Sequence, residues 1–247
     1  MSGLLAPLAY GPDGWGDELL AGAWLSLRLA LAALPVGLAI GLASALMRDG
    51  RARIPRAVGE LYGTVFRGLP ELLTISIVYF GAPRLATHLV AFAEALLGLP
   101  PSGFQAQIDG FAAGVLALAL VLGAFSSEVF LGALRAVPGG QREAAAALGM
   151  TGVQSLRLVI LPQVLRLAMP GLANNWTTLL KDTSLVSVIA LPELMRQANL
   201  AAIGTRQPFL IYLAACLLYL VMSLVSERIG RSAEAAGRRR MPGEAAR

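Results

Sequence analysis

Long apolar segments alternate with shorter polar ones along the whole chain. The hydrocarbon core of a bilayer is about 30 Å thick and needs about 20 apolar residues in helical form. Five segments reach that length: Leu19–Met47, Val58–Phe80, Phe111–Leu134, Met169–Leu191 and Phe209–Glu227. The pattern therefore predicts an all-α integral membrane protein with five transmembrane helices.

The composition supports this prediction and excludes other classes of protein. Hydrophobic residues make up 56% of the 247 residues and charged residues 14%, and the mean hydropathy is +0.67. Ordinary soluble domains have roughly 45–50% apolar and about 25% charged residues. The single cysteine, Cys216, excludes a disulfide framework. The single histidine, His88, leaves no His-pair site, so we expect no metal site.

The distribution of positive charge favours one orientation in the membrane. Fourteen Lys and Arg residues lie in one alternate set of the segments between the spans, and three lie in the other set. The rich set is 48–57, 134–168 and 228–247, and the poor set is 1–18, 81–110 and 192–208. Lys and Arg concentrate in cytoplasmic segments, so we expect the N-terminus outside and the C-terminus in the cytoplasm. Since these arginines lie between apolar spans, the net charge of +5 does not indicate nucleic-acid binding.

Segment 137–168, on the expected inner face, predicts two short helices joined by a glycine turn. Residues 141–148 have high helix propensity, and Gly149 suits the left-handed position that ends a helix. Thr151–Gln154 matches a capping box, which begins a second helix, and Pro162 is expected to end or kink that helix. Such an element can present a knob to another protein. The alternative is an interfacial hairpin that only anchors the chain.

The fourth span carries an unusual number of polar residues. Asn174, Asn175, Thr177, Thr178, Lys181, Asp182 and Ser184 fall on about half of the helix circumference. A polar arc this wide is expected to line a cavity or a helix interface rather than face lipid. The candidate pathway residues here are Asn174, Asn175, Thr178, Lys181, Asp182 and Ser184. The alternative role is hydrogen bonding between helices.

The second span is expected to break near Pro70, which removes a backbone donor and disfavours helical geometry at Leu69. Glu71 follows this break and is a candidate pathway residue that attracts a cation. The alternative is a structural ion pair with Arg67, because residues four apart share a helix face. Glu128, in the third span, is expected to pair with Arg135 or with a neighbouring helix.

The chain has no phosphate-binding loop of its own. That motif needs a lysine after a glycine, and the single lysine lies in Leu180-Lys181-Asp182. We therefore expect a transport subunit rather than an enzyme. Five spans are an odd number, so two equal inverted halves within one chain are not expected. A translocation path then needs a second copy or a sister chain.

The predicted cytoplasmic knob also carries a spaced motif. Glu143-Ala144-Ala145 is followed after three residues by Gly149 and, after nine more, by Val159 and Leu161-Pro162. This pattern resembles the "EAA" loop of permease subunits of ATP-binding-cassette (ABC) importers, with Val159 in place of an isoleucine. In that family the loop is the coupling helix, which docks on the ATPase subunit. The resemblance implies an ATPase-coupling role for Glu143, Ala144, Ala145, Gly149, Leu161 and Pro162.

Four further segments resemble the polar amino acid branch of that family. They are Phe66–Leu73, Leu134–Gln141, Pro170–Trp176 and Leu179–Ser187. Within the branch they are most similar to permease subunits for arginine, for histidine, lysine, arginine and ornithine, and for opines. The acidic residue after Pro70 resembles the carriers of basic amino acids, so the resemblance implies a cationic substrate.

The resemblance also implies an architecture and partners. The chain would be a type I importer transmembrane domain in the bacterial inner membrane, with a periplasmic segment 1–18, a permease domain 19–227 that contains the coupling loop 137–168, and a basic cytoplasmic tail 228–247. The implied partners are two ATPase subunits, a second permease subunit, an amino acid binding protein and the lipid bilayer. ATP and Mg²⁺ would bind to the ATPase, and this chain would hold no cofactor.

The alternative function is an ion-coupled secondary carrier or a channel. It would use the same intramembrane Lys181 and Asp182, but it leaves the element from Glu143 to Pro162 without a role. Dependence of transport on ATP rather than on a proton gradient distinguishes the two functions.

Overall fold

The computed structural model describes residues 3, 6–12, 14–100 and 102–239, and these residues form a helical protein. Parts of the expected segments 1–18 and 228–247 lie outside the described residues. The α-helices are α1 (Gly16–Asp49), α2 (Arg53–Gly68), α3 (Glu71–Leu97), α4 (Gly110–Ala136), α5 (Gly139–Ala147), α6 (Gly152–Ser155), α7 (Leu161–Asp182), α8 (Leu194–Thr205) and α9 (Pro208–Arg239). A π-helical turn, Leu156–Ile160, precedes α7, and 3₁₀ turns occupy Ala6–Leu8 and Thr183–Ile189.

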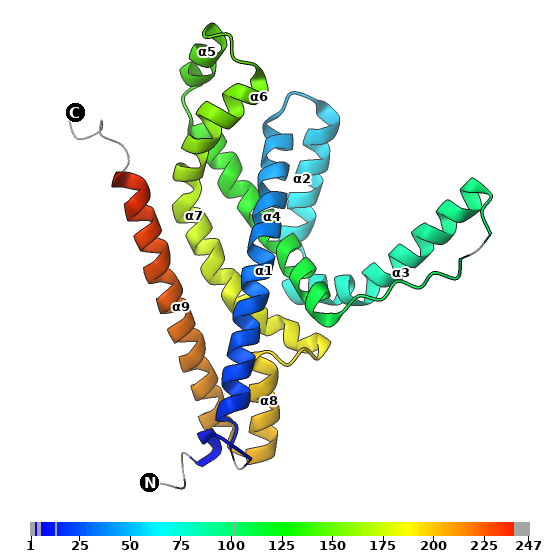
Figure 1. The fold of residues 1–247 in the computed structure, drawn as a ribbon, viewed down its shortest axis with the longest axis vertical. Helices are drawn as coiled ribbons and strands as arrows, with labels where there is room; N and C mark the ends of the chain where they lie inside the picture. Colours follow the sequence, from blue (N-terminus) through cyan, green and yellow to red (C-terminus); the bar gives the residue numbers. More distant parts are fainter. Residues whose placement is uncertain (1–2, 4–5, 13, 101, 240–247) are drawn as a thin grey trace.

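Five helical stretches in the described residues are long and apolar enough to cross a membrane. They are Gly16–Asp49, Glu71–Leu97, Gly110–Ala136, Gly152–Ile189 and Pro208–Arg228. The predicted number of spans is therefore confirmed. Helices α1 and α9 both begin at the end of the bundle where α8 lies, and α5 and α6 form the opposite end (Figure 1).

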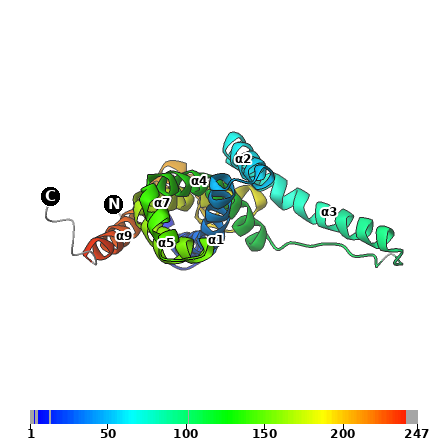
Figure 2. The same cartoon turned by 90° about the horizontal axis from the view of Figure 1, so that it is seen from above.

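The second predicted span has the expected break but different bounds. Leu69 and Pro70 have extended backbones, with ψ of 142° and 131°, between the end of α2 and the start of α3. The predicted bounds Val58–Phe80 are wrong, because the apolar span begins after the break and runs over Glu71–Leu97. Figure 2 shows α3 projecting away from the bundle as an arm.

The fourth predicted span begins earlier than expected. Helical backbone runs without interruption from Gly152 through the π turn into α7, so Pro162 does not end a helix. Pro162 instead lies in the first turn of α7, directly after the π turn, where the regular i→i−4 hydrogen bonding is already interrupted. The N–H of Leu161 donates to the carbonyl of Leu156, five residues back, as in a π-helix.

The central packing contact joins α1 to α4. A Cβ at Gly37 on α1 would meet the Leu122 side chain at 2.6 Å, and one at Gly123 on α4 would meet the Gly37 carbonyl oxygen at 3.1 Å. Small residues at these positions let the two backbones approach closely, as is common between membrane helices. Around them, Leu29 and Leu118 are buried in the main apolar cluster. This rigid pair of helices supports the residues described next.

Candidate functional site

A cavity of about 200 Å³ lies between α3, α4 and the end of α7. Its polar lining is Glu71, Asn174, Asn175, Thr178 and Asp182. Its apolar lining is Ile75, Leu118, Val121, Leu122, Phe125, Leu179 and Leu185. A concave, mostly apolar site with a few convergent polar groups is the usual form of a small-molecule site. Five of the seven predicted pathway residues therefore meet in one place.

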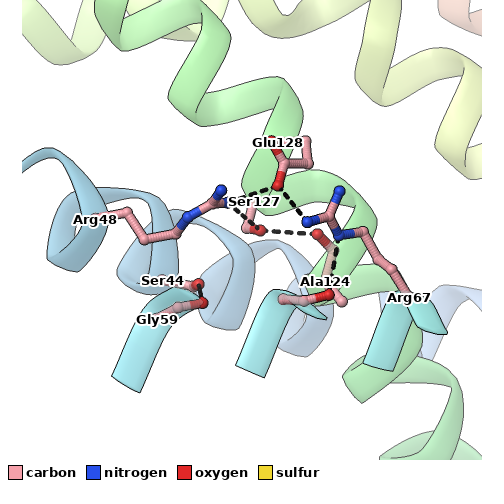
Figure 3. A network of polar contacts seen from close by, with 8 residues as sticks. Ser44, Arg48, Gly59, Arg67, Ala124, Ser127 and Glu128 are labelled. Carbon is pink, nitrogen blue, oxygen red and sulfur yellow. Dashed lines mark hydrogen bonds and ion pairs between the residues drawn. The ribbon is translucent and has the colours of Figure 1, made fainter. Parts of the chain in front are cut away.

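Glu71 reaches this cavity because of the break at Pro70. The break makes Glu71 the first residue of α3, where the positive end of the helix dipole favours a carboxylate. Arg67, the alternative partner of Glu71, instead places Nη2 at 2.7 Å from the Glu128 carboxylate on α4. Figure 3 shows Arg67 turned toward Glu128. The carboxylate of Glu71 is thus left to the cavity.

Asp182 ends α7 and faces Glu71. The two carboxyl groups are close enough for a direct side-chain contact. They come from different membrane-spanning stretches, and both line the cavity. Two acidic groups on one small cavity favour a cation bound in that cavity, because opposite charges attract most strongly away from bulk water.

The amides on α7 combine the two roles that the sequence left open. The side-chain nitrogen of Asn175 donates to the Ser126 hydroxyl on α4 at 3.2 Å, so this amide does hydrogen-bond between helices. Asn174 and Thr178 are exposed and line the cavity. Ser126 is a contact that the sequence did not indicate.

Two predicted pathway residues lie apart from the cavity lining. Lys181 is exposed, and Ser184 donates its hydroxyl hydrogen to the Lys181 carbonyl at 2.7 Å. They flank the cavity-lining Asp182 at the point where α7 tightens into the 3₁₀ turn Thr183–Ile189. Their predicted role in the pathway is therefore not supported by a shared cavity.

The predicted knob lies at the other end of α4. Gly149 has a φ of +77°, and Thr151 and Gln154 form the expected capping box. Within α5, Glu143 and Ala144 are exposed, whereas Ala145 is buried against the rest of the chain. The helix therefore presents a free outer face.

The knob continues into α7 through large exposed apolar residues. Leu148 is 77% and Val153 is 75% exposed. Leu161 and Pro162 form the start of α7, at the base of this element. An apolar surface bounded by polar residues is typical of a protein-binding site.

A buried carboxylate at the opposite end of the bundle was missed by the sequence analysis. Glu193 caps α8 and accepts hydrogen bonds from the backbone N–H groups of Met195 at 2.8 Å and Arg196 at 2.7 Å. The hydroxyls of Ser26 and Tyr219 donate to it at 3.3 and 3.2 Å. Burial raises the pKa of this carboxyl to about 6. An acid directly after Leu-Pro and before a helix is the local signal for such a cap.

Comparison with known proteins places these features in a family. Residues 36–236 match the model of the binding-protein-dependent transport system inner membrane component. The nopaline transport system permease protein NocQ of Agrobacterium fabrum is 41% identical over 226 residues, which cover 91% of this chain and 92% of that protein.

Two further proteins extend the comparison. The arginine ABC transporter permease protein ArtQ of Escherichia coli is 38% identical over 216 residues, which cover 85% of this chain and 91% of that protein. A crystal structure of an amino acid ABC transporter with histidines matches with a TM-score of 0.72 and 31% identity, covering 90% of this chain and 95% of that one. This chain belongs to the family of binding-protein-dependent transport system inner membrane components.

Proposed function

We propose that this chain is a permease subunit of an ATP-driven importer and that its substrate is a cationic amino acid or an opine. The observation that carries the substrate class is the pair of carboxyl groups, Glu71 and Asp182, on one cavity. The similarity to permeases named for arginine and nopaline supports the same substrate class.

Each group that lines the cavity has a specific role in this proposal. Glu71 and Asp182 attract the positive charge of the substrate, and the amide of Asn174 and the hydroxyl of Thr178 hydrogen-bond to its polar atoms. The buried apolar lining, such as Leu118 and Leu122, keeps water from one side of the cavity, which strengthens these contacts. Asn175 holds α7 to α4 through Ser126, so that the two walls keep their spacing.

The exposed α5 is the proposed contact with an ATPase subunit. Glu143 and Ala144 lie on its free face, and Gly149 ends the helix in a left-handed turn. ATP and Mg²⁺ bind to the partner ATPase in this proposal, because the sequence contains no phosphate-binding loop. This chain is proposed to hold no cofactor. Two ATPase subunits and a separate amino acid binding protein complete the importer.

The exposed arm formed by α3 supports the proposal that a second permease subunit is a further partner. Large side chains such as Leu89 and Phe92 are 57% and 67% exposed on the arm. In the return from α3 to α4, residues 98–100 and 102–109 have irregular backbone, which lipid does not accommodate. A protein surface from a copy or a sister chain can satisfy both features.

The proposed setting is the bacterial inner membrane, with the α5 end in the cytoplasm. The excess of Lys and Arg at residues 134–168 supports this orientation. The N-terminus then lies outside, together with α8, and the binding protein delivers the substrate at that end.

Uptake into liposomes that contain the reconstituted complex tests the proposal. The assay compares labelled arginine, lysine, an opine and the neutral amino acid glutamine, with and without ATP and the binding protein. We expect uptake of the cationic substrates to require both. Uptake driven by a proton gradient without ATP would instead indicate a secondary carrier, and preferential uptake of glutamine would contradict the substrate class.

A further inference from the structure

Three ion pairs lie in series between the exposed α5 and the cavity. Arg142, on α5, places Nη2 at 2.9 Å from the Asp49 carboxylate at the end of α1. The next residue back, Arg48, places Nη1 at 2.8 Å from Glu128 on α4. Arg67, at the end of α2, places Nη2 at 2.7 Å from the same Glu128 oxygen. We call these three contacts the ion-pair chain.

Glu128 is the centre of the ion-pair chain. Figure 3 shows its carboxylate between the two guanidinium groups of Arg48 and Arg67, which come from different helices. Arg48 also donates to the Ser127 hydroxyl at 3.4 Å, and Arg67 donates its Nε–H to the Gly63 carbonyl at 2.9 Å. If the charge of Glu128 were removed, two like charges would face each other without the anion that both contact.

One end of the ion-pair chain leads to the cavity by two routes. Glu71 follows Arg67 by four residues, across the non-helical Leu69 and Pro70. Phe125, another lining residue, lies one helical turn before Glu128 on α4. A displacement of Arg67 therefore reaches Glu71 within four residues, and a displacement of Glu128 reaches Phe125 within one helical turn.

The other end of the ion-pair chain leads to the ATPase-facing surface. Arg142 directly precedes Glu143 on α5. Asp49 and Arg48 are neighbours in the last turn of α1, so a pull on Asp49 acts on the backbone that carries Arg48. The contacts therefore run from α5 through α1 and α4 to α2.

We propose that Glu128 is a positioning residue. It holds Arg67, and through Arg67 it holds Glu71, so that both residues move together with α5. The position of the Glu71 carboxylate in the cavity then follows the position of the element that contacts the ATPase. This inference rests on the proposed function and adds to it the route by which ATP hydrolysis changes the substrate site.

The burial of the ion-pair chain supports a role in coupling rather than in folding. The side chains of Arg48, Arg67 and Glu128 are 13%, 34% and 37% exposed. Ion pairs between partly exposed groups such as Arg67 and Glu128 add little to stability. Separate apolar clusters already join α1 to α4, and the Tyr62 hydroxyl on α2 donates to the Leu120 carbonyl on α4 at 2.6 Å. Loss of the Glu128 charge is therefore expected to leave the fold intact.

Simultaneous measurement of uptake and ATP hydrolysis in the same liposomes tests the inference. In Glu128→Gln we expect the complex to assemble and hydrolyse ATP, while arginine uptake per ATP falls by about fivefold or more. Glu60→Gln is the matched control, because Glu60 is an exposed acid on α2 outside the ion-pair chain. Its ratio of uptake to hydrolysis is expected to equal that of the wild type.

A double-mutant cycle shows whether the contacts act as one chain. Arg142→Ala and Glu128→Gln should each lower uptake per ATP, and the double variant should lose no more than the worse single variant. Independent, multiplying losses would overturn the inference, as would an unchanged ratio in Glu128→Gln.

A second variant covers the case in which Glu128→Gln does not assemble. Arg67→Gln leaves the Arg48–Glu128 pair in place and is expected to lower the ratio in the same way. A wild-type ratio in Arg67→Gln would overturn the inference. Absence of ATP-dependent uptake in the wild-type complex would contradict the proposed function instead.

Discussion

The helices α3 and α4 have the same length, 27 residues each, yet they relate to the rest of the chain in opposite ways. Within an apolar stretch of 18 residues, 67% of the residues of α4 are buried, against 11% of those of α3. The contact positions of α4 are small, as at Gly123, whereas α3 exposes large side chains such as Phe92. The comparison teaches that two apolar helices of equal length serve two purposes, an internal scaffold in α4 and an outward surface in α3.

The comparison also explains where the cavity lies. It forms where the buried helix α4 meets the first turn of α3, before the arm leaves the bundle (Figure 1). Glu71 and Ile75 belong to that first part of α3, and Ile75 is fully buried. The root of α3 is therefore fixed by this chain, and its distal part is left for a partner.

The largest expected effect comes from a charge on the arm. Phe92→Asp should weaken association with the second permease subunit at least about tenfold, because large aromatic residues carry much of the binding energy at interfaces. The measurement is the oligomeric state of the purified protein by light scattering across a dilution series. Ile203→Asp, at an exposed apolar position on α8, is the matched control. Equal association in Phe92→Asp and in the control would remove the distinction between α3 and α4.

A smaller effect is expected from adding one methyl group to each helix. A Cβ at Gly123 would meet the Tyr62 hydroxyl at 2.6 Å, whereas one at Gly81 on α3 meets only the Ile77 side chain at 3.8 Å. Gly123→Ala should therefore cost about 1–3 kcal/mol of stability, as overpacked sites do, and Gly81→Ala should cost nothing measurable. Melting temperatures in detergent compare the two variants. A lower melting temperature for Gly81→Ala than for Gly123→Ala would reverse the comparison.

The last contrast is one of pH dependence, between a carboxylate buried in the bundle and one on the arm. Burial raises the pKa of Glu193 to about 6 from an ordinary 4.5, so the folded state binds this proton more tightly than the unfolded state does. Stability from this group is therefore fully present below pH 4.5 and is lost as the pH rises through 6, by about 2 kcal/mol.

Melting temperatures measured between pH 4.5 and pH 7 check this dependence. Glu193→Gln should flatten the profile, since a neutral amide does not titrate. Glu94→Gln, on the arm, where the carboxylate is contacted by the exposed Ser102 N–H at 3.2 Å, should keep the profile of the wild type. Identical profiles for the wild type and Glu193→Gln would contradict the assignment.

Local features of the fold were predictable from the sequence. The break at Pro70, the left-handed turn at Gly149 and the capping box at Thr151 each depend on a few adjacent residues, and each is confirmed. The sequence left open whether Pro162 ends or kinks its helix. The helix continues past Pro162, because the π turn directly upstream already interrupts the regular hydrogen bonding.

Contacts between distant segments could be predicted only as alternatives. The polar arc on the fourth span indicated a cavity. Whether Glu71 faces that cavity depended on whether Glu71 pairs with Arg67. The sequence left both possibilities open, because the competing partner Glu128 lies on another helix. Glu193 was missed for a related reason, since its contacts with Ser26 and Tyr219 arise only when α1, α8 and α9 pack together.

Equilibrium binding of labelled arginine to the purified complex tests the central claim most directly. The wild type is compared with the double variant Glu71→Gln/Asp182→Asn, which keeps the shape of the cavity and removes its negative charge. We predict that the double variant binds arginine at least about tenfold more weakly, because it removes the charged partners of a cation, while assembly with the ATPase is unchanged. Equal arginine affinity in the two proteins would contradict the assignment of this cavity as the substrate site.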